Sequence, residues 1–258
     1  MAKGISIKFK SYKESIPKIL ELLKLEKELQ KYDKVVLKPT LNSPQQSTNL
    51  EFVEEVLKFC ISHKNPVAEV FIAEGSDGYD TEELFDELGY RKLAEKYNVG
   101  LVDLNTADVE EIELDGFLNF SKIKYPSILR DSFIISLPAI SEDEEILFFG
   151  SLANMLGAYP SEHYSGFFTK AKKKIKNNLK NSIHDILMCK MPQFAIMDLS
   201  SEGIILAGIP LEMDKQAAHY FDFEWKDVPY LRLINDSFSE DNQQKGKVVE
   251  EAAEEEEE

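Results

Sequence analysis

The sequence is poor in the residues that build metal clusters and cross-linked folds. Its 258 residues include only two cysteines, Cys60 and Cys189, and four histidines. The cysteines form no CxxC pair, so we expect this chain to bind no iron–sulfur cluster and no zinc ribbon. One cysteine pair would not make a disulfide scaffold, although the sequence leaves a single bond open. The histidines show neither HxxxH nor HxH spacing, which makes a zinc site a weak interpretation.

Long apolar stretches are missing as well. No run of about 18 apolar residues occurs, so we expect no membrane-spanning segment. Residues 1–10 alternate polar and apolar side chains and lack the apolar core of a signal peptide. These absences favour a cytoplasmic protein with no membrane contact.

Basic residues are outnumbered by acidic ones, and the excess is uneven. The net charge is −17, and residues 240–258 carry nine acids and two bases, which leaves −10 for the rest. An acidic body argues against broad nucleic-acid binding, which needs a positive surface. The sequence predicts one α/β domain over residues 1–236. Residues 237–258 offer too little apolar area to offset their ordering entropy and are predicted to be a disordered acidic tail.

What the body does contain is an alternation of strand-like and helix-like segments. Short apolar runs typical of buried parallel strands alternate with amphipathic stretches at helical spacing. Such repeats with short links imply a mainly parallel sheet with helices on both faces. The alternating pattern from Val109 to Tyr125, with a turn at Asp115-Gly116, predicts a small β-rich insertion. The expected strands are Ile5–Phe9, Val35–Leu37, Val67–Ala73, Val99–Asp103, Phe133–Pro138, Phe194–Asp198 and Val228–Ile234.

Helix signals are clearest between these runs. Thr48 to Glu51 match a capping box at the start of a helix, and Asp80 is typical of a second cap. Gly89 is expected to break the helix that follows Asp80. Ile146–Leu156 reads as an apolar helix, and Lys170–Lys190 as a helix with many lysines.

Charged residues stand where three of the expected strands end. Lys38, Glu74 and Asp198 follow apolar runs, and ligands of open α/β sheets bind outside the carboxyl ends of strands. We therefore expect these three side chains to converge around a hollow. An ammonium group there can pair with an anionic ligand or with a carboxylate. Glu74, Asp77 and Asp198 can together hold a divalent metal ion, although a salt bridge or a capped turn is the simpler interpretation.

The lysine-rich segment offers another kind of function. Six lysines between Lys170 and Lys180 make a basic face on an acidic protein. Such a face can dock an acidic partner, RNA or the protein's own tail. A solvated helix face is the simpler interpretation.

Several segments, in this order, resemble the family called domain of unknown function 362. The resemblance extends from about Lys34 to Pro210. Its segments are Val35–Leu41, Ser47-Thr48, Ala73–Ser76, Leu88–Tyr90, Leu101–Leu104, Asp131–Pro138, Leu152–Gly157, Phe194–Asp198 and Ala207–Pro210.

The sequence also departs from the family pattern. The family's Lys-Thr-His loop is Ala139–Asp143 here, the lysine before its helical asparagine is Ala153, and the asparagine after its proline is Thr40. The ferredoxin-like cluster segment of many relatives is absent. The resemblance therefore implies a divergent member. Together with the strand ends, it points to these ligand-binding residues: Lys38, Thr40, Asn42, Thr48, Glu74, Gly75, Ser76, Asn154, His163 and Asp198.

The expected function is binding of a small anionic or metal-bound ligand at the strand ends, with little or no catalysis. One alternative is a partner-binding protein that uses the Lys170–Lys180 segment and the acidic tail. Another, implied by the resemblance, is a redox enzyme linked to a separate ferredoxin. The sequence specifies no reaction.

Overall fold

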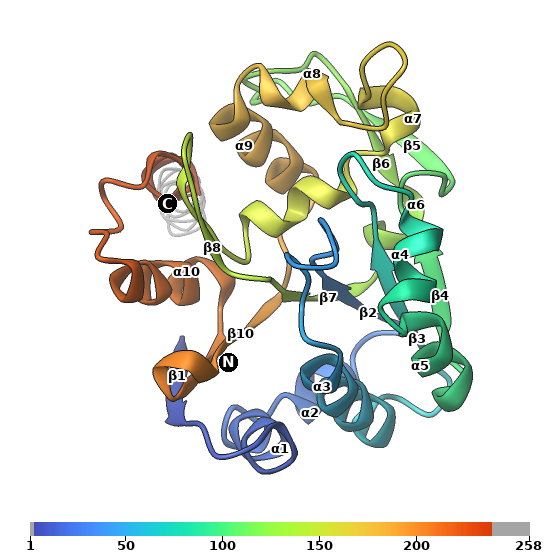
Figure 1. Ribbon diagram of the computed structural model, residues 1–258, viewed down its shortest axis with the longest axis vertical. Helices are drawn as coiled ribbons and strands as arrows, with labels where there is room; N and C mark the ends of the chain where they lie inside the picture. The colour runs from blue at the N-terminus through green and yellow to red at the C-terminus, as the bar shows by residue number, and fades with distance from the viewer. Residues whose placement is uncertain (1–2, 239–258) are drawn as a thin grey trace, which may run out of the picture.

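A seven-stranded sheet forms the centre of the protein, with strands in the order β1-β11-β10-β7-β2-β3-β4 (Figure 1). The structure is a computed structural model that describes residues 3–238. The five strands from β10 to β4 run parallel, and β11 is antiparallel to both β10 and β1. The predicted α/β fold is thus confirmed. The strands are β1 (Gly4–Lys8), β2 (Lys34–Pro39), β3 (Glu69–Glu74), β4 (Gly100–Asp103), β7 (Phe133–Leu137), β10 (Phe194–Leu199) and β11 (Ile204–Gly208).

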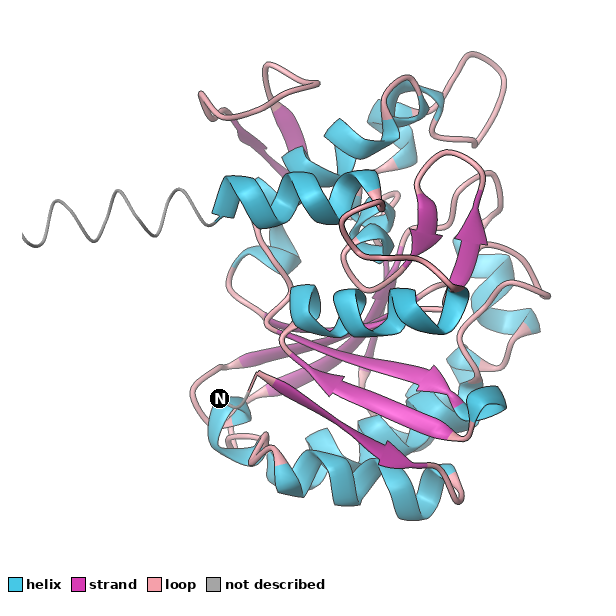
Figure 2. Ribbon diagram, turned by 90° about the vertical axis from the view of Figure 1, so that its left-hand side faces the viewer, coloured by secondary structure: helices cyan, strands magenta, loops and turns pink. Residues whose placement is uncertain are grey.

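Helices lie on both sides of this sheet (Figure 2). The first half contributes α1 (Tyr12–Leu22), α2 (Glu26–Leu29), α3 (Leu50–His63), α4 (Thr81–Glu87), α5 (Tyr90–Tyr97) and α6 (Ser127–Arg130). The second half contributes α7 (Ser161–Tyr164), α8 (Lys173–Lys176), α9 (Leu179–Cys189) and α10 (Pro210–Ala218). Three 3-10 helices are η1 (Ala153–Ala158), η2 (Ser200–Glu202) and η3 (His219–Phe221), and residues 229–238 are also helical.

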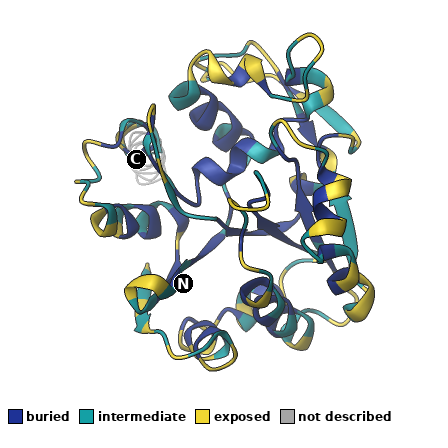
Figure 3. Ribbon diagram, viewed as in Figure 1, coloured by how far each residue is buried: buried dark blue, intermediate teal, exposed yellow. Residues whose placement is uncertain are grey.

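Each face of the sheet has its own apolar core, because successive side chains of a strand point to opposite faces. Val35 and Leu37 belong to one core, which they share with α1 to α5. Val36 belongs to the other, with η1, α9, α10 and the helical residues 229–238. The buried sheet lies between these layers, and exposed residues lie mainly on the outer sides of the helices (Figure 3). Burial on both faces explains the unbroken apolar run Val35–Leu37 in β2.

Two small antiparallel pairs stand outside the main sheet. β5 (Val109–Ile112) pairs with β6 (Ile123–Pro126), which confirms the predicted β-rich insertion. The second pair, β8 (Ser141–Asp143) with β9 (Leu147–Phe149), corrects the first part of the helix predicted for Ile146–Leu156, whose last residues lie in the 3-10 helix η1. The carboxylate of Asp143 accepts hydrogen bonds from the backbone of residues 145 and 146, which turns the chain back on itself.

Two other predicted elements were wrong. The single helix expected over Lys170–Lys190 is divided into α8 and α9, because Asn178 caps a new helix by accepting from the Asn181 N–H. The strand expected at Val228–Ile234 is helical. Its buried residues Leu231 and Ile234 are three apart, a helical spacing, and tertiary packing here overrides the strand propensity of the run.

The predicted terminal boundary is only partly covered. Residues 237–238 continue the last helix, whereas the rest of the predicted acidic tail, residues 239–258, lies outside the described residues. The assignment of residues 1–236 to one domain stays a prediction. None of the helices within residues 3–238 combines the length and apolar character needed to cross a membrane.

The cap of α3 is shifted by one residue from the predicted capping box. Asn49, not Thr48, is the cap, and its side-chain oxygen accepts from the N–H groups of Glu51 (2.9 Å) and Phe52 (3.2 Å). Thr48 instead ties the loop to the strands. Its hydroxyl accepts from the Thr40 N–H at 2.8 Å and donates to the Leu137 carbonyl at 2.6 Å.

We therefore expect Asn49→Ala to lower the free energy of unfolding by about 1 kcal/mol, since two backbone donors lose their acceptor. Asn49→Asp retains an acceptor and should unfold close to the wild type. Urea titration followed by circular dichroism measures both variants. Equal stability of Asn49→Ala and the wild type would show that this cap contributes nothing.

Candidate functional site

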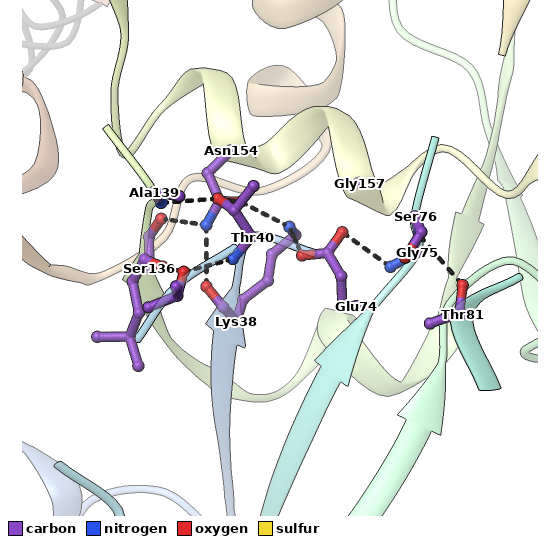
Figure 4. A network of polar contacts seen from close by, with 12 residues as sticks. Lys38, Thr40, Glu74, Gly75, Ser76, Thr81, Ser136, Ala139, Asn154 and Gly157 are labelled. Atoms are coloured by element: carbon purple, nitrogen blue, oxygen red, sulfur yellow. Dashed lines mark hydrogen bonds and ion pairs between the residues drawn. The ribbon is translucent and has the colours of Figure 1, made fainter. Parts of the chain in front are cut away.

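A buried ion pair joins the carboxyl ends of the two neighbouring strands β2 and β3. Lys38 Nζ lies 2.6 Å from Glu74 Oε2, and the two side chains are 0% and 3% exposed (Figure 4). The second carboxylate oxygen of Glu74 accepts from the Gly75 N–H at 2.9 Å. Burial lowers the pKa of Lys38, and the charge of Glu74 opposes that shift. The sequence prediction that these two strand ends converge agrees with this geometry.

Asn154, from η1, locks the pair to its surroundings. Its carbonyl oxygen accepts from Lys38 Nζ at 3.1 Å and from the Thr40 hydroxyl at 2.9 Å. Its amide group donates to the Lys38 carbonyl at 2.9 Å and to the Ser136 hydroxyl at 3.0 Å. A single asparagine thus connects the ends of the two adjacent strands β7 and β2 with Thr40, which directly follows β2 (Figure 4). Five of the predicted residues, Lys38, Thr40, Glu74, Gly75 and Asn154, belong to one hydrogen-bonded network.

Gly157, near the end of η1, lies directly against this network. A Cβ atom at this position would be 2.1 Å from Glu74 Oε1 and 2.6 Å from Lys38 Nζ, closer than real Cβ contacts. Gly75 faces Gly157 in the same way, since its Cβ would lie 2.4 Å from the Gly157 carbonyl oxygen. Both glycines are needed because backbone must approach the charged groups closely. The segment 152–157 therefore supplies both the asparagine and the glycine of the site.

A second buried lysine lies at the same place. Lys172 is 1% exposed, and its Nζ donates to the Gly75 carbonyl at 2.6 Å and to the Gly157 carbonyl at 3.1 Å. Its own backbone N–H donates to Asp77 at 2.7 Å, which fixes the loop before α8. Burial lowers the pKa of Lys172 to about 8; Glu74 opposes this shift, whereas the charge of Lys38 adds to it. Lys172 belongs to the predicted basic face, and its burial beside Glu74 was not predicted from the sequence.

Other lysines of the predicted basic face are engaged in contacts as well. Lys176 forms an ion pair with Asp77 at 2.7 Å, and Lys170 pairs with Asp80. Lys174 Nζ donates to the His163 carbonyl at 2.6 Å. The segment is therefore not a uniform solvated basic face.

A cavity of about 380 Å³ opens next to the buried cluster. Glu74, Gly75, Asn154, Gly157 and Lys172 line it on the side of the sheet. Its remaining lining is mostly polar or charged, and includes Asn42, Ser43, Gln46, Asp77, Ser141, Glu142, Asp143 and Lys176. The cavity lies at the carboxyl edge of the parallel strands, where ligands bind in open α/β sheets.

Asp198 is separate from Glu74. Its carboxylate accepts from the Tyr12 hydroxyl at 2.6 Å and from the Ser200 N–H at 3.0 Å. It lines a neighbouring pocket of about 270 Å³ together with Asn42 and Thr48. Burial, together with the bond to Asp198, raises the pKa of Tyr12 to about 12. The three charges expected around one hollow are thus not gathered there, because Glu74 and Asp198 line different pockets and Lys38 lines neither of them.

The remaining predicted residues have mainly structural contacts. Asp77 holds the Lys172 backbone and Lys176, and His163 lies in the short helix α7. Ser76 is buried, and its N–H donates to Thr81 at 3.1 Å. Within residues 3–238, no group of three or more histidine, cysteine or acidic side chains is placed to hold a metal ion. The ligand set proposed from Glu74, Asp77 and Asp198 is therefore not assembled.

Fold and site together define an α/β protein with a buried Lys–Glu–Lys cluster beneath a polar cavity at the carboxyl edge of its sheet. Residues 35–202 match the family described as Domain of unknown function (DUF362), and the chain belongs to this family. No curated protein matches the chain. The family's description names no reaction, so any function must be argued from the site.

Proposed function

We propose that this protein binds a small organic anion in the cavity beside Lys172. The observation that carries the proposal is a buried ammonium group without a carboxylate in its hydrogen bonds. Lys172 contacts two neutral carbonyl oxygens, whereas Lys38 is bonded to Glu74. Two lysines and one glutamate give the buried cluster a formal excess of one positive charge. Since buried charge is costly unless paired, an anionic ligand would supply the missing partner.

The rest of the lining limits the ligand's size and charge. Glu142 and Asp143 also border the cavity, and Asp77 already pairs with Lys176. These carboxylates would repel a polyanion such as a nucleoside triphosphate. A ligand with a single anionic head and a polar remainder fits better. Asn42, Ser43 and Gln46 can hydrogen-bond to that remainder.

Lys172→Met should weaken binding of a small carboxylate by about tenfold or more, because the charge-assisted hydrogen bond contributes roughly 1.5–3 kcal/mol. The probes are L-lactate and acetate, titrated calorimetrically into the full chain. Lys173→Met is the matched control, since Lys173 is the exposed next residue and should leave affinity unchanged.

The pH dependence has a defined sign. The protonated form of Lys172 binds the anion, so affinity should fall as the pH rises through about 8, the lowered pKa of Lys172. Binding that is equal in Lys172→Met and wild type, or no binding of either carboxylate at millimolar concentration, would refute the proposal.

A second candidate is the partner-binding function. Its support is the loop before Lys172, where Phe167 and Phe168 are 91% and 100% exposed and the Gly166 N–H donates to the Ala171 carbonyl at 3.1 Å. Exposed aromatic pairs are typical of contact surfaces. The alternative of a redox enzyme linked to a ferredoxin is supported only by Lys172. This lysine places a cation at the site, whereas Ala153 and residues 139–143 stand where the family pattern has basic residues.

A further inference from the structure

The hydrogen bonds of Lys172 leave one position of its amine open. An ammonium nitrogen carries three N–H groups, and two are directed to the carbonyls of Gly75 and Gly157. In the neutral amine both N–H groups stay on these carbonyls, and the lone pair takes the fourth tetrahedral position. Lys172 is among the residues that line the cavity, so this position is the one available to a ligand held there. At this position the nitrogen therefore presents an N–H donor when Lys172 is charged and its nucleophilic lone pair when Lys172 is neutral.

The surroundings of Lys172 favour its neutral form more strongly than solvent favours the neutral form of an exposed lysine. Lys172 is desolvated, and the charged groups acting on it are Lys38 of β2, Glu74 of β3, Asp103 of β4 and Asp77 of the loop after β3. Desolvation and a neighbouring cation are the two conditions that activate lysine as a nucleophile. The pKa of about 8 means that a substantial fraction is neutral near physiological pH.

We infer that Lys172 forms an imine with the carbonyl carbon of a small 2-oxoacid held in the cavity. The inference rests on the proposed function, because the carboxylate of the oxoacid is the anion that pairs with the ammonium group. In a 2-oxoacid the carbonyl carbon is one bond from the carboxylate. An anion recognised by Lys172 therefore brings this carbon within reach of the same nitrogen.

The step is balanced without an oxidant or another co-reactant. The lone pair of neutral Lys172 attacks the carbonyl carbon, and a C–N bond forms as the C–O π bond breaks. The carbonyl oxygen then leaves as water with the two amine protons, and a C=N bond remains. If the imine takes up a proton, its single N–H keeps one of the two glycine carbonyls as acceptor. The positive charge also stays beside the ligand carboxylate.

Reductive trapping tests this inference on the full chain. The protein is incubated with pyruvate and sodium cyanoborohydride near pH 7.5, and adducts are located by intact mass and peptide mapping. We expect one adduct per chain at Lys172, at least about tenfold above any lysine with an ordinary pKa near 10.4. Excess L-lactate, which has the carboxylate but no carbonyl, should protect Lys172. The trapping rate should rise between about pH 7 and 9, opposite to the trend for carboxylate binding.

Two variants distinguish loss of the imine from loss of folding. Lys172→Arg retains the charge and the donors but should lose at least about tenfold of the trapped adduct, because guanidinium stays protonated. Lys173→Met should be trapped like the wild type. Suppose that lactate binding depends on Lys172 but that no adduct forms, or that adducts are spread over many lysines. The imine would then be refuted and the proposed function retained. Absence of both lactate binding and the adduct would overturn both.

Discussion

Lys38→Met is expected to lower the free energy of unfolding by about 3–5 kcal/mol, the range for breaking one partner of a buried ion pair. Glu74, which is 3% exposed, would lose its cation at 2.6 Å. Asn154 would lose the Lys38 donor as well, while the nearby Lys172 remains bonded to the two glycine carbonyls. The cost arises from the carboxylate left behind, not only from the lost contact.

Urea titration of three variants separates these contributions. The double variant Lys38→Met with Glu74→Met should lose less stability than Lys38→Met alone, because it leaves no buried carboxylate without its cation. The control is Lys122→Met, which removes an exposed lysine 2.6 Å from Glu111 and should change stability by no more than about 1 kcal/mol. A Lys38→Met protein as stable as Lys122→Met would mean that Glu74 does not depend on Lys38.

The second large effect is expected at Gly157. Gly157→Ala adds a Cβ atom that would lie 2.1 Å from Glu74 Oε1 and 2.6 Å from Lys38 Nζ. Overpacking of this kind costs typically about 1–3 kcal/mol, and here the atoms that must move belong to a bonded ion pair. The variant should also bind lactate at least about tenfold more weakly, because the displaced Gly157 carbonyl orients Lys172.

Gly116→Ala is the matched control for this substitution. A Cβ at Gly116 would meet only the terminal methyl of Met188, at 3.0 Å, and that flexible side chain can move aside. Its unfolding midpoint and lactate affinity should stay near the wild type. If Gly157→Ala behaves like Gly116→Ala in both measurements, the close approach of backbone to the ion pair has no energetic weight.

The part of the site built from adjacent strands was predictable from sequence. Parallel strand ends meet at one edge, so apolar runs that end in Lys38 and Glu74 predict neighbouring charges. The family resemblance added Asn154, which no periodicity would have placed beside Lys38. Asp198 follows the same rule, but it is two strands away from Lys38 and faces a different pocket. Strand order, which the sequence did not give, decides which charges meet.

Lys172 could not be found from its local pattern. It stands in a run of lysines, and only the contact of its loop with the residues after β3 distinguishes it from Lys173. The wrong strand at Val228–Ile234 and the helix predicted to begin at Ile146, where β9 lies instead, have a related cause. Both runs are apolar enough for either structure, and short apolar runs are ambiguous until their packing is known.

The charged floor of the cavity, formed by Lys172 and Glu74, is held in place largely by hydrogen bonds to main-chain atoms. Gly75 and Gly157 offer their carbonyls to Lys172, and the Gly75 N–H donates to Glu74. Main-chain groups persist when neighbouring side chains are replaced. Evolution can therefore exchange the surrounding residues of 42–46 and 141–143 and alter selectivity while the floor survives intact. Diversification within such a lineage would then be concentrated in those two segments.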